Sequence, residues 1–195
     1  SGDDNYGESA WDDAELLQDW TGSASSITNK TKPRSNGGTN YQAGLRKAKE
    51  LLKSSRPGAL TAVIFVSDGD PTFRYDSDGA TMGNGSSDDW NYNLDAAITE
   101  IGTLSAHYFF SVGVGPSRNY QKLKDLKDAA TLVNAENRKF YEGTNTTTLN
   151  SAFNSILASV TTLRCTDVTV TDVLSKNVTM VTDNNNKPEA LTITV

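Results

Sequence analysis

The sequence predicts an α/β fold, in which a doubly wound, mostly parallel sheet carries helices on both faces. Two short apolar runs, at residues 61–67 (TAVIFVS) and 107–114 (HYFFSVGV), are typical of strands that a parallel sheet buries on both faces. Segments with apolar residues at helical spacing alternate with these runs, and turn sequences such as Arg56-Pro57-Gly58 separate them. This alternation favours an open sheet covered by helices.

The expected elements follow one another regularly along the chain. A short helix is expected at residues 23–29, where Ser or Thr can cap the first turn. Apolar residues then recur at helical spacing in four segments, at residues 45–52, 94–104, 123–130 and 149–160. A further short strand is expected at residues 139–141, and a long polar insertion fills residues 68–89. Helices and strands are therefore predicted to alternate from Thr39 to Leu163.

The pattern changes after Leu163. Val168 and Val170 alternate with threonines, and the last residues, 191–195 (LTITV), alternate in the same way. A period of two is typical of strands with one face in water. We therefore expect two parts: an α/β domain over residues 1–163, and the first strands of an all-β module of Ig-like or pilin type over residues 164–195.

Composition and charge exclude several classes of function. The chain has 18 Lys and Arg against 24 Asp and Glu, a net charge of −6, which disfavours a nucleic-acid-binding surface. No apolar run reaches the roughly 20 residues that span a bilayer. The single cysteine, Cys165, and the single histidine, His107, exclude an internal disulfide framework and multi-histidine zinc chemistry. No nucleophile–base pair is visible, so we expect no enzyme.

Two residues are candidate metal ligands. Ligands bind beyond the carboxyl ends of the strands in such a sheet, and Asp68 directly follows the strand at residues 61–67. Upstream of this strand, Thr39 lies in a Gly-rich loop just before the predicted helix that contains residues 45–52. A hydroxyl and a carboxylate together suit Mg²⁺. The alternatives are ordinary local roles, with Thr39 as a helix N-cap and Asp68 in an Asx-turn.

The insertion at residues 68–89 carries two further candidates, each with a simpler alternative. Its acids could form a calcium site, although their spacing fits no EF-hand and a solvated acidic loop is favoured; they are Asp70, Asp76, Asp78, Asp88 and Asp89. Its flanking aromatics could be a contact surface or could pack the loop down, and both interpretations stay open; they are Phe73, Tyr75, Trp90 and Tyr92. His107 is expected to be structural.

Several of these motifs together resemble a von Willebrand factor type A domain. They are residues 37–45 (GGTNYQAGL), 63–69 (VIFVSDG) and 112–115 (VGVG), with the apolar stripe of the last helix. The Asp-Gly-Asp-Pro-Thr sequence at residues 68–72 and the trailing residues 165–181 resemble the adhesin-type members on Gram-positive surface pili. The resemblance implies a Rossmann-like fold and a location outside the cell, on a pilus or the cell wall.

The resemblance also implies a metal site and a partner. Thr39 would be the second-loop hydroxyl ligand and Asp68 the third-loop acid of a metal-ion-dependent adhesion site. The metal would be Mg²⁺, or Ca²⁺ or Mn²⁺ in its place, and an acidic side chain of an extracellular protein ligand would fill its open position. The physics agrees, since a cation held mostly by neutral oxygens keeps positive charge and attracts a carboxylate.

One part of the family pattern does not occur in this sequence. The family's first loop has the form Asp-x-Ser-x-Ser, on a strand that would lie beside residues 61–67. We therefore expect residues 1–163 to form a partial domain, whose sheet is completed by an upstream segment of the same protein. The metal is then expected to bind this chain alone weakly or not at all. Cys165 is expected to pair with a cysteine in that upstream segment.

The function expected from these observations is adhesion at the cell surface, with binding of a host or matrix protein through a divalent-metal-dependent face. One alternative is a structural pilin or stalk domain that keeps the fold without ligand binding. Another is the A-type domain of an intracellular Mg²⁺-dependent ATPase complex. The β-rich segment after Cys165 argues against that last alternative.

Overall fold

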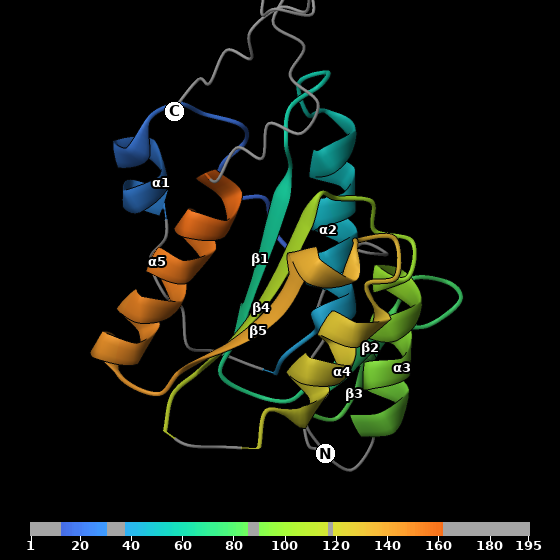
Figure 1. Ribbon diagram of the computed structural model, residues 1–195. Helices are drawn as coiled ribbons and strands as arrows, with labels where there is room; N and C mark the ends of the chain where they lie inside the picture. Colours follow the sequence, from blue (N-terminus) through green and yellow to red (C-terminus); the bar gives the residue numbers. More distant parts are fainter. Residues whose placement is uncertain (1–12, 31–37, 86–89, 117–118, 162–195) are drawn as a thin grey trace, which may run out of the picture. The chain divides into compact units, whose positions relative to one another are not determined.

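The computed structural model describes residues 13–30, 38–85, 90–116 and 119–161 (Figure 1). The all-β module expected at residues 164–195 and the expected pairing of Cys165 lie outside the described residues. In chain order the elements are α1 (Ala24–Lys30), α2 (Tyr41–Lys53), β1 (Ala62–Ser67), β2 (Phe73–Tyr75), β3 (Thr81–Gly83), α3 (Trp90–Ile101), β4 (Tyr108–Val114), α4 (Gln121–Ala129), β5 (Arg138–Gly143) and α5 (Thr146–Thr161). The predicted α/β class is confirmed.

The main sheet has three parallel strands in the order β1-β4-β5. Helices α2, α3 and α4 pack on one face, where Leu45, Ile101 and Leu126 are fully buried against Phe109 of β4. Helix α5 packs on the other face, where Ile156 meets Phe110 (Figure 1). Because adjacent residues of a strand point to opposite faces, Phe109 and Phe110 are each 0% exposed, which confirms the predicted burial of this strand on both faces.

Strand β1 differs from its prediction. Val63 and Phe65 lie on the α2 face, where the Phe65 ring meets Tyr41 edge-on with centroids 4.9 Å apart. On the opposite face Ile64 is 41% exposed and Val66 is 47% exposed. The expectation of burial on both faces is therefore wrong for β1. The physical reason is that α5 packs on β5 and β4, and no other described strand pairs with the free edge of β1.

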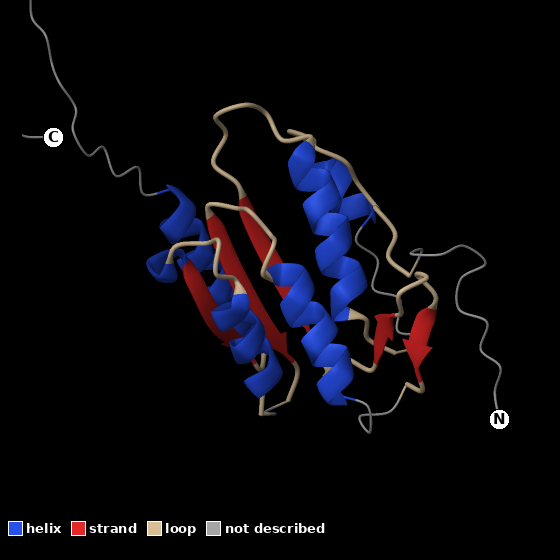
Figure 2. Ribbon diagram, turned by 90° about the vertical axis from the view of Figure 1, so that its right-hand side faces the viewer, coloured by secondary structure: helices blue, strands red, loops and turns tan. Residues whose placement is uncertain are grey.

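The polar insertion contains an antiparallel hairpin, β2-β3, which the sequence did not indicate. Figure 2 shows it apart from the three-stranded sheet. Asp76 shapes its turn, since one carboxylate oxygen accepts hydrogen bonds from the backbone N–H groups of Asp78 and Ala80, each 2.9 Å long. Tyr75 is buried, and its backbone N–H donates to the Gln42 side chain at 2.8 Å. These contacts anchor the hairpin to α2.

Candidate metal-binding edge of the sheet

Thr39 is held in place by the loop that follows β1. Its carbonyl accepts hydrogen bonds from the backbone N–H groups of Thr72 (2.8 Å) and Phe73 (3.1 Å). Its own N–H donates to the Thr72 hydroxyl at 2.8 Å. The helix N-cap is the next residue, Asn40, whose side chain accepts from the N–H of Ala43. The alternative role of Thr39 as N-cap is therefore wrong, and its hydroxyl makes no hydrogen bond among the described residues.

The structure brings the Thr39 loop and the Asp68 loop together. A Cβ atom placed on Gly69, the residue after Asp68, would lie 3.8 Å from the Thr39 hydroxyl oxygen. The Gly69 carbonyl accepts hydrogen bonds from the Tyr41 phenol and from the Ser67 hydroxyl, the latter 3.0 Å long. Two donors on one carbonyl fix the backbone at the carboxyl end of β1, so the two predicted ligands belong to adjoining, ordered loops.

The acids at this edge affect the ionisation of Tyr41. Burial raises the pKa of Tyr41 to about 12, the hydrogen bond with Ser67 acts in the opposite direction, and the negative charges of Asp70 and Asp68 raise the pKa further. The Tyr41 phenol therefore keeps its proton and acts as a hydrogen-bond donor. The effect also places both carboxylates within electrostatic reach of the same hydroxyl.

The two carboxylates differ in their partners. Asp70 forms an ion pair with Lys122 of α4, whose side chain is 14% exposed. Asp68 is exposed and makes no ion pair among the described residues. Of the two, Asp68 is the carboxylate without an ion pair among the described residues, while Lys122 balances the charge of Asp70.

Asp13 is a nearby acid that sequence reasoning missed. Its carboxylate accepts a hydrogen bond from the Asn40 side chain at 2.7 Å, and its backbone N–H donates to the Tyr75 phenol oxygen at 2.8 Å. The residue lies in a segment interpreted as loop, and no local pattern connects it with residues 27 positions away. Only the tertiary structure places it beside the Thr39 loop.

The oxygen atoms at this edge are of the chemical type that a hard cation binds. A neutral hydroxyl from Thr39 and one carboxylate from Asp68 are oxygen ligands of the type that Mg²⁺ takes. They are few, since Mg²⁺ prefers six ligands in octahedral geometry. The described ranges, 13–30, 38–85, 90–116 and 119–161, contain no cluster of three or more Asp, Glu, His or Cys able to hold a metal ion. Thr39 and Asp68 alone therefore do not complete the coordination shell of Mg²⁺.

The acidic and aromatic residues of the insertion, the other candidates from the sequence, have different positions in the structure. Asp76 is used within its own turn, as above, and Asp88 and Asp89 lie outside the described residues. Phe73 packs closely enough that a Cβ on Gly38 would lie 2.0 Å from its ring. Tyr92 is 66% exposed, with the Arg74 guanidinium 5.5 Å from its ring centroid. Phe73 and Tyr75 therefore pack the insertion down and Tyr92 lies on the surface, while the side chain of Trp90 lies outside what the structure describes.

His107 lies at the other end of the sheet. Its Nδ1 accepts a hydrogen bond from the backbone N–H of Thr61 at 3.0 Å, and its own backbone N–H donates to the Thr61 carbonyl at 3.0 Å. These bonds join the segments that lead into β1 and β4. They agree with the structural role expected for this residue.

The described part of the chain is thus an α/β domain with a candidate ligand-binding edge at the carboxyl end of β1. No family model matches the sequence, and no curated protein matches it. Among solved structures, it is similar to two crystal structures of the pilus adhesin SpaC from Lactobacillus rhamnosus GG, one of them in an open conformation. Each is 17% identical and covers 71% of this chain, with TM-scores of 0.46 and 0.47.

This chain corresponds to 21% and 22% of the length of those two SpaC chains. At this identity and TM-score the similarity by itself assigns neither fold nor function, so the fold stands on the strand order and register given above. None of the described helices has both the length and the apolar character that crossing a membrane requires.

Proposed function

We propose that this chain is part of a cell-surface adhesion domain that binds an extracellular host or matrix protein through a divalent-metal-dependent face. The observation that carries the proposal is the meeting of two loops at one edge of a parallel sheet. One loop presents a Thr39 hydroxyl without a hydrogen bond among the described residues, and the other presents the exposed carboxylate of Asp68.

The charges at the edge fit this role. Mg²⁺ bound there would supply an open coordination position to a carboxylate of the partner protein. Thr39 contributes no charge and Asp68 contributes one negative charge, while Lys122 balances Asp70. The Asp13 carboxylate, bonded to Asn40, adds a second negative charge. The two positive charges of Mg²⁺ would offset these two carboxylates, so an acidic partner side chain is attracted to the cation. The Tyr41 phenol keeps the Asp68 loop in position by donating to Gly69.

The open side of β1 supports completion of the sheet by an upstream segment of the same protein. One edge of β1 pairs with no strand in the described part of the chain, and Ile64 and Val66 of the same strand are exposed. Helix α5 adds Phe153, 40% exposed, and Leu157, 58% exposed. A parallel strand placed against this edge would carry further ligands to the loops of Thr39 and Asp68.

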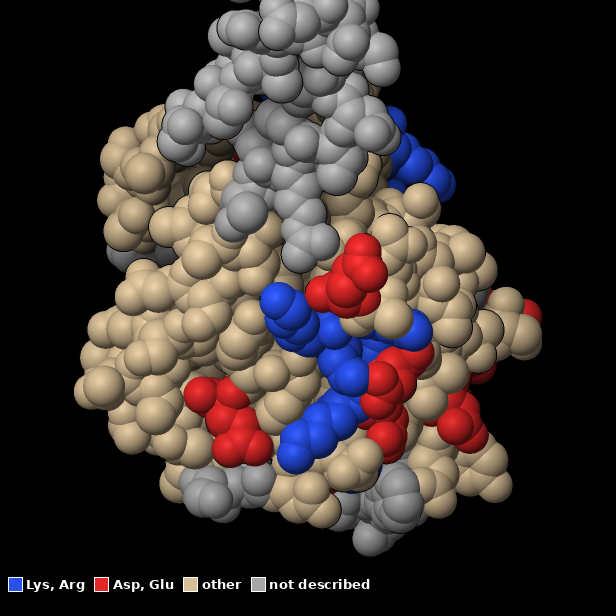
Figure 3. Space-filling model, viewed as in Figure 1, with Lys and Arg blue, Asp and Glu red and all other residues tan. Residues whose placement is uncertain are grey.

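Helix α5 is itself unusual for a surface helix. Its 16 residues, TTTLNSAFNSILASVT, include no charged side chain. Figure 3 shows Lys, Arg, Asp and Glu gathered toward the α4 side of the molecule, with the area over α5 largely without them. Two of its apolar side chains one turn apart, Phe153 and Leu157, are exposed, and an exposed apolar patch of this kind is typical of a surface that other protein covers. The same upstream segment is our proposed cover.

Adhesion in the presence and absence of metal tests the proposal. The complete protein should bind immobilised extracellular-matrix proteins in Mg²⁺ and lose at least about tenfold of that binding in EDTA or on Asp68→Ala, because one charged ligand is lost. Asp95→Ala removes an exposed acid from α3 and is the matched control. Binding that is indifferent to EDTA and to Asp68→Ala would contradict the proposal.

That contrary result would favour the alternative of a structural pilin or stalk domain. One observation supports this alternative, namely the Asp70–Lys122 ion pair. An ammonium group beside the edge neutralises a carboxylate without any metal ion. A stalk domain would keep the fold and this ion pair, and it would show no metal-dependent binding to matrix proteins.

A further inference from the structure

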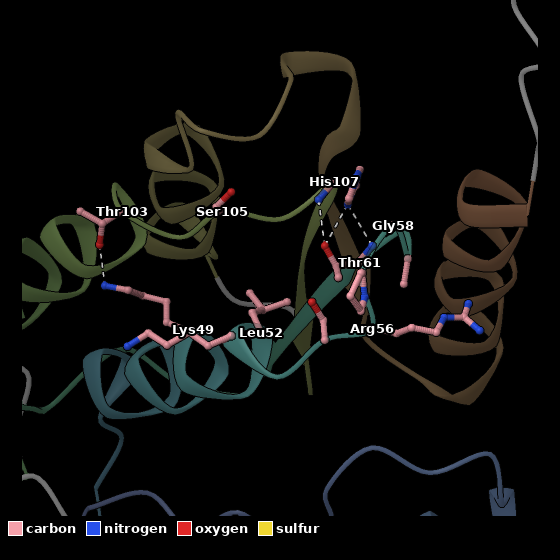
Figure 4. A pocket seen from close by; sticks show the side chains of 12 residues that line it. Lys49, Leu52, Arg56, Gly58, Thr61, Thr103, Ser105 and His107 are labelled. Atoms are coloured by element: carbon pink, nitrogen blue, oxygen red, sulfur yellow. Dashed lines mark hydrogen bonds between the residues drawn. The ribbon is translucent and has the colours of Figure 1, made fainter.

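A cavity lies at the opposite end of the sheet from Thr39 and Asp68. It has a volume of about 650 Å³ and is lined by the end of α2 and by residues from the segments leading into β1 and β4 (Figure 4). Cavities of this size are typical of small-ligand sites. The cavity reaches Thr61, which directly precedes the first residue of β1, whereas Asp68 directly follows the last one. The cavity is therefore separate from the candidate metal edge.

The cavity is positively charged in a chain whose net charge is −6. Its lining includes Lys49, Lys53 and Arg56 and no acidic residue. Behind it Glu100 pairs with Lys49 at 2.6 Å and with Arg46 at 3.1 Å, so one carboxylate serves two cations. Lys53 and Arg56 make no ion pair in the described part of the chain. A net positive charge thus remains at the cavity, and it attracts anions.

The lining also offers hydrogen-bonding groups that the fold does not use. The hydroxyls of Ser55 and Ser105 have no partner among the described residues. The Nδ1 atom of His107 accepts a hydrogen bond from the Thr61 backbone, so the neutral ring carries its proton on Nε2 and can donate it. Figure 4 shows His107 and Thr61 together on the wall formed by the strands, with Arg56 extending away from Lys49.

An exposed indole lies along the continuation of this cavity. A neighbouring cavity of about 550 Å³ shares Arg56 and Thr61 with the first and is lined on its far side by Trp20. The Trp20 Nε1 donates to the Leu51 carbonyl at 3.2 Å and to the Ser54 hydroxyl at 3.1 Å. The ring is therefore held in place, while 52% of the residue is exposed. Its electron-rich face is available to C–H groups of a ligand.

We propose that these two cavities form a binding groove for an acidic oligosaccharide, one that carries sulfate or uronic-acid groups. Lys53 and Arg56 pair with the anionic groups, because charge-assisted hydrogen bonds are strong. Ser55, Ser105 and the His107 Nε2–H bond sugar hydroxyls, and Trp20 stacks on a pyranose ring. Cations, hydroxyls and a fixed aromatic face in one groove match the anionic groups, hydroxyls and C–H faces of an acidic sugar.

Calorimetric titration with a heparin-derived hexasaccharide tests this groove in the complete protein. Lys53→Gln/Arg56→Gln should weaken binding at least about tenfold, since two charged hydrogen-bond donors are lost. Lys139→Gln removes one exposed cation from β5 and should leave the affinity within about twofold. Circular dichroism verifies that each variant is folded. Equal affinity of the double variant and the wild type would overturn the proposal.

Further titrations show which chemical groups of the ligand are required for binding. Hyaluronan hexasaccharide, which carries carboxylates only, should bind if uronic acids suffice, and weaker binding than heparin assigns the preference to sulfate. Cellohexaose, hexaglutamate and inorganic sulfate should each bind at least about tenfold more weakly than the better of the two acidic sugars. Equal binding of any of these three would overturn the assignment to an acidic sugar.

The same titration in EDTA distinguishes this groove from the proposed metal edge. Acidic-sugar binding should be unchanged by EDTA and by Asp68→Ala, because the groove lies at the other end of β1. Loss of sugar binding in EDTA would overturn the groove and assign the sugar to the metal edge. Failure of metal-dependent adhesion to matrix proteins would leave the groove standing.

Discussion

At the scale of single residues, the candidate edge depends on a small set of hydrogen bonds around the Gly69 carbonyl. Tyr41 and Ser67 both donate to it, and Thr39 lies beside the same glycine. Tyr41 is 1% exposed, so its phenol cannot exchange this bond for one to water. The position of the Asp68 loop is therefore coupled to the protonation of one buried phenol.

This coupling predicts an alkaline loss of stability. The pKa of Tyr41 is about 12 in the folded chain and about 10 in an unfolded one, so between these values the unfolded state loses a proton that the folded state keeps. The free energy of unfolding should fall by up to about 1.4 kcal/mol per pH unit from this group. The contribution is fully present below about pH 10 and is lost as pH rises through about 12.

Urea denaturation of wild type and Tyr41→Phe across pH 8–12 measures this loss. The variant lacks the phenol proton. Its free energy of unfolding should therefore fall less steeply above pH 10, with a slope smaller by up to about 1.4 kcal/mol per pH unit. The two curves should run parallel below pH 9, where the phenol is protonated in both states. Parallel curves over the whole range would contradict the burial of an ionisable phenol at this edge.

At the scale of elements, apolar periodicity predicts the helices and the three main strands well. Runs such as residues 61–67 and 107–114 are dominated by β-branched and aromatic side chains, and these formed β1 and β4. The hairpin β2-β3 was not predictable, because each strand has three residues and its stability comes from contacts with α2 such as that of Gln42. Local pattern does not report such distant contacts.

Strands β1 and β4 also show that a local sequence pattern does not determine how far each face of a strand is buried. Both have the sequence of a strand buried on two faces, yet Phe110 is 0% exposed while Ile64, its register partner in β1, is 41% exposed. The difference lies in what covers each position, and coverage is a property of the whole assembly. In the same way the sequence predicted that the loops of Thr39 and Asp68 lie close together, whereas the position of Asp13 beside Asn40 depends on tertiary structure. The role of Thr39 and Asp68 as metal ligands stays a prediction.

The exposed face of β1 predicts a context-dependent effect of Ile64→Ala. In this chain the substitution should reduce the free energy of unfolding by less than about 1 kcal/mol, because the side chain is half-exposed. In the complete protein, with the proposed upstream strand and cover in place, the cost should rise to about 2–5 kcal/mol.

Chemical denaturation of both lengths of protein gives the comparison. Phe110→Ala is the matched control, since its ring is 0% exposed here and its loss should cost about 3–5 kcal/mol in both. An equally small cost of Ile64→Ala in both lengths would show that nothing covers this face of β1 in the complete protein.

At the scale of the whole molecule, the two ends of the sheet have different chemistry. The carboxyl end of β1 carries the Thr39 hydroxyl, the exposed carboxylate of Asp68 and the Asp70–Lys122 ion pair, with Asp13 close by on Asn40. The amino end carries Lys53 and Arg56 in a groove without acids. An adhesive domain with both would bind an acidic protein side chain through metal at one end and an acidic sugar at the other. The two activities are separable by EDTA.

In the proposed function, Thr39 and Asp68 form part of a divalent-metal site that an upstream segment completes. Calorimetric titration of Mg²⁺ into the complete protein tests it most directly, with Asp68→Ala and Thr39→Val as the site variants and Asp95→Ala as control. We expect Asp68→Ala to abolish measurable binding and Thr39→Val to weaken it at least about tenfold, with the control unchanged. Wild-type affinity in Asp68→Ala would contradict the account.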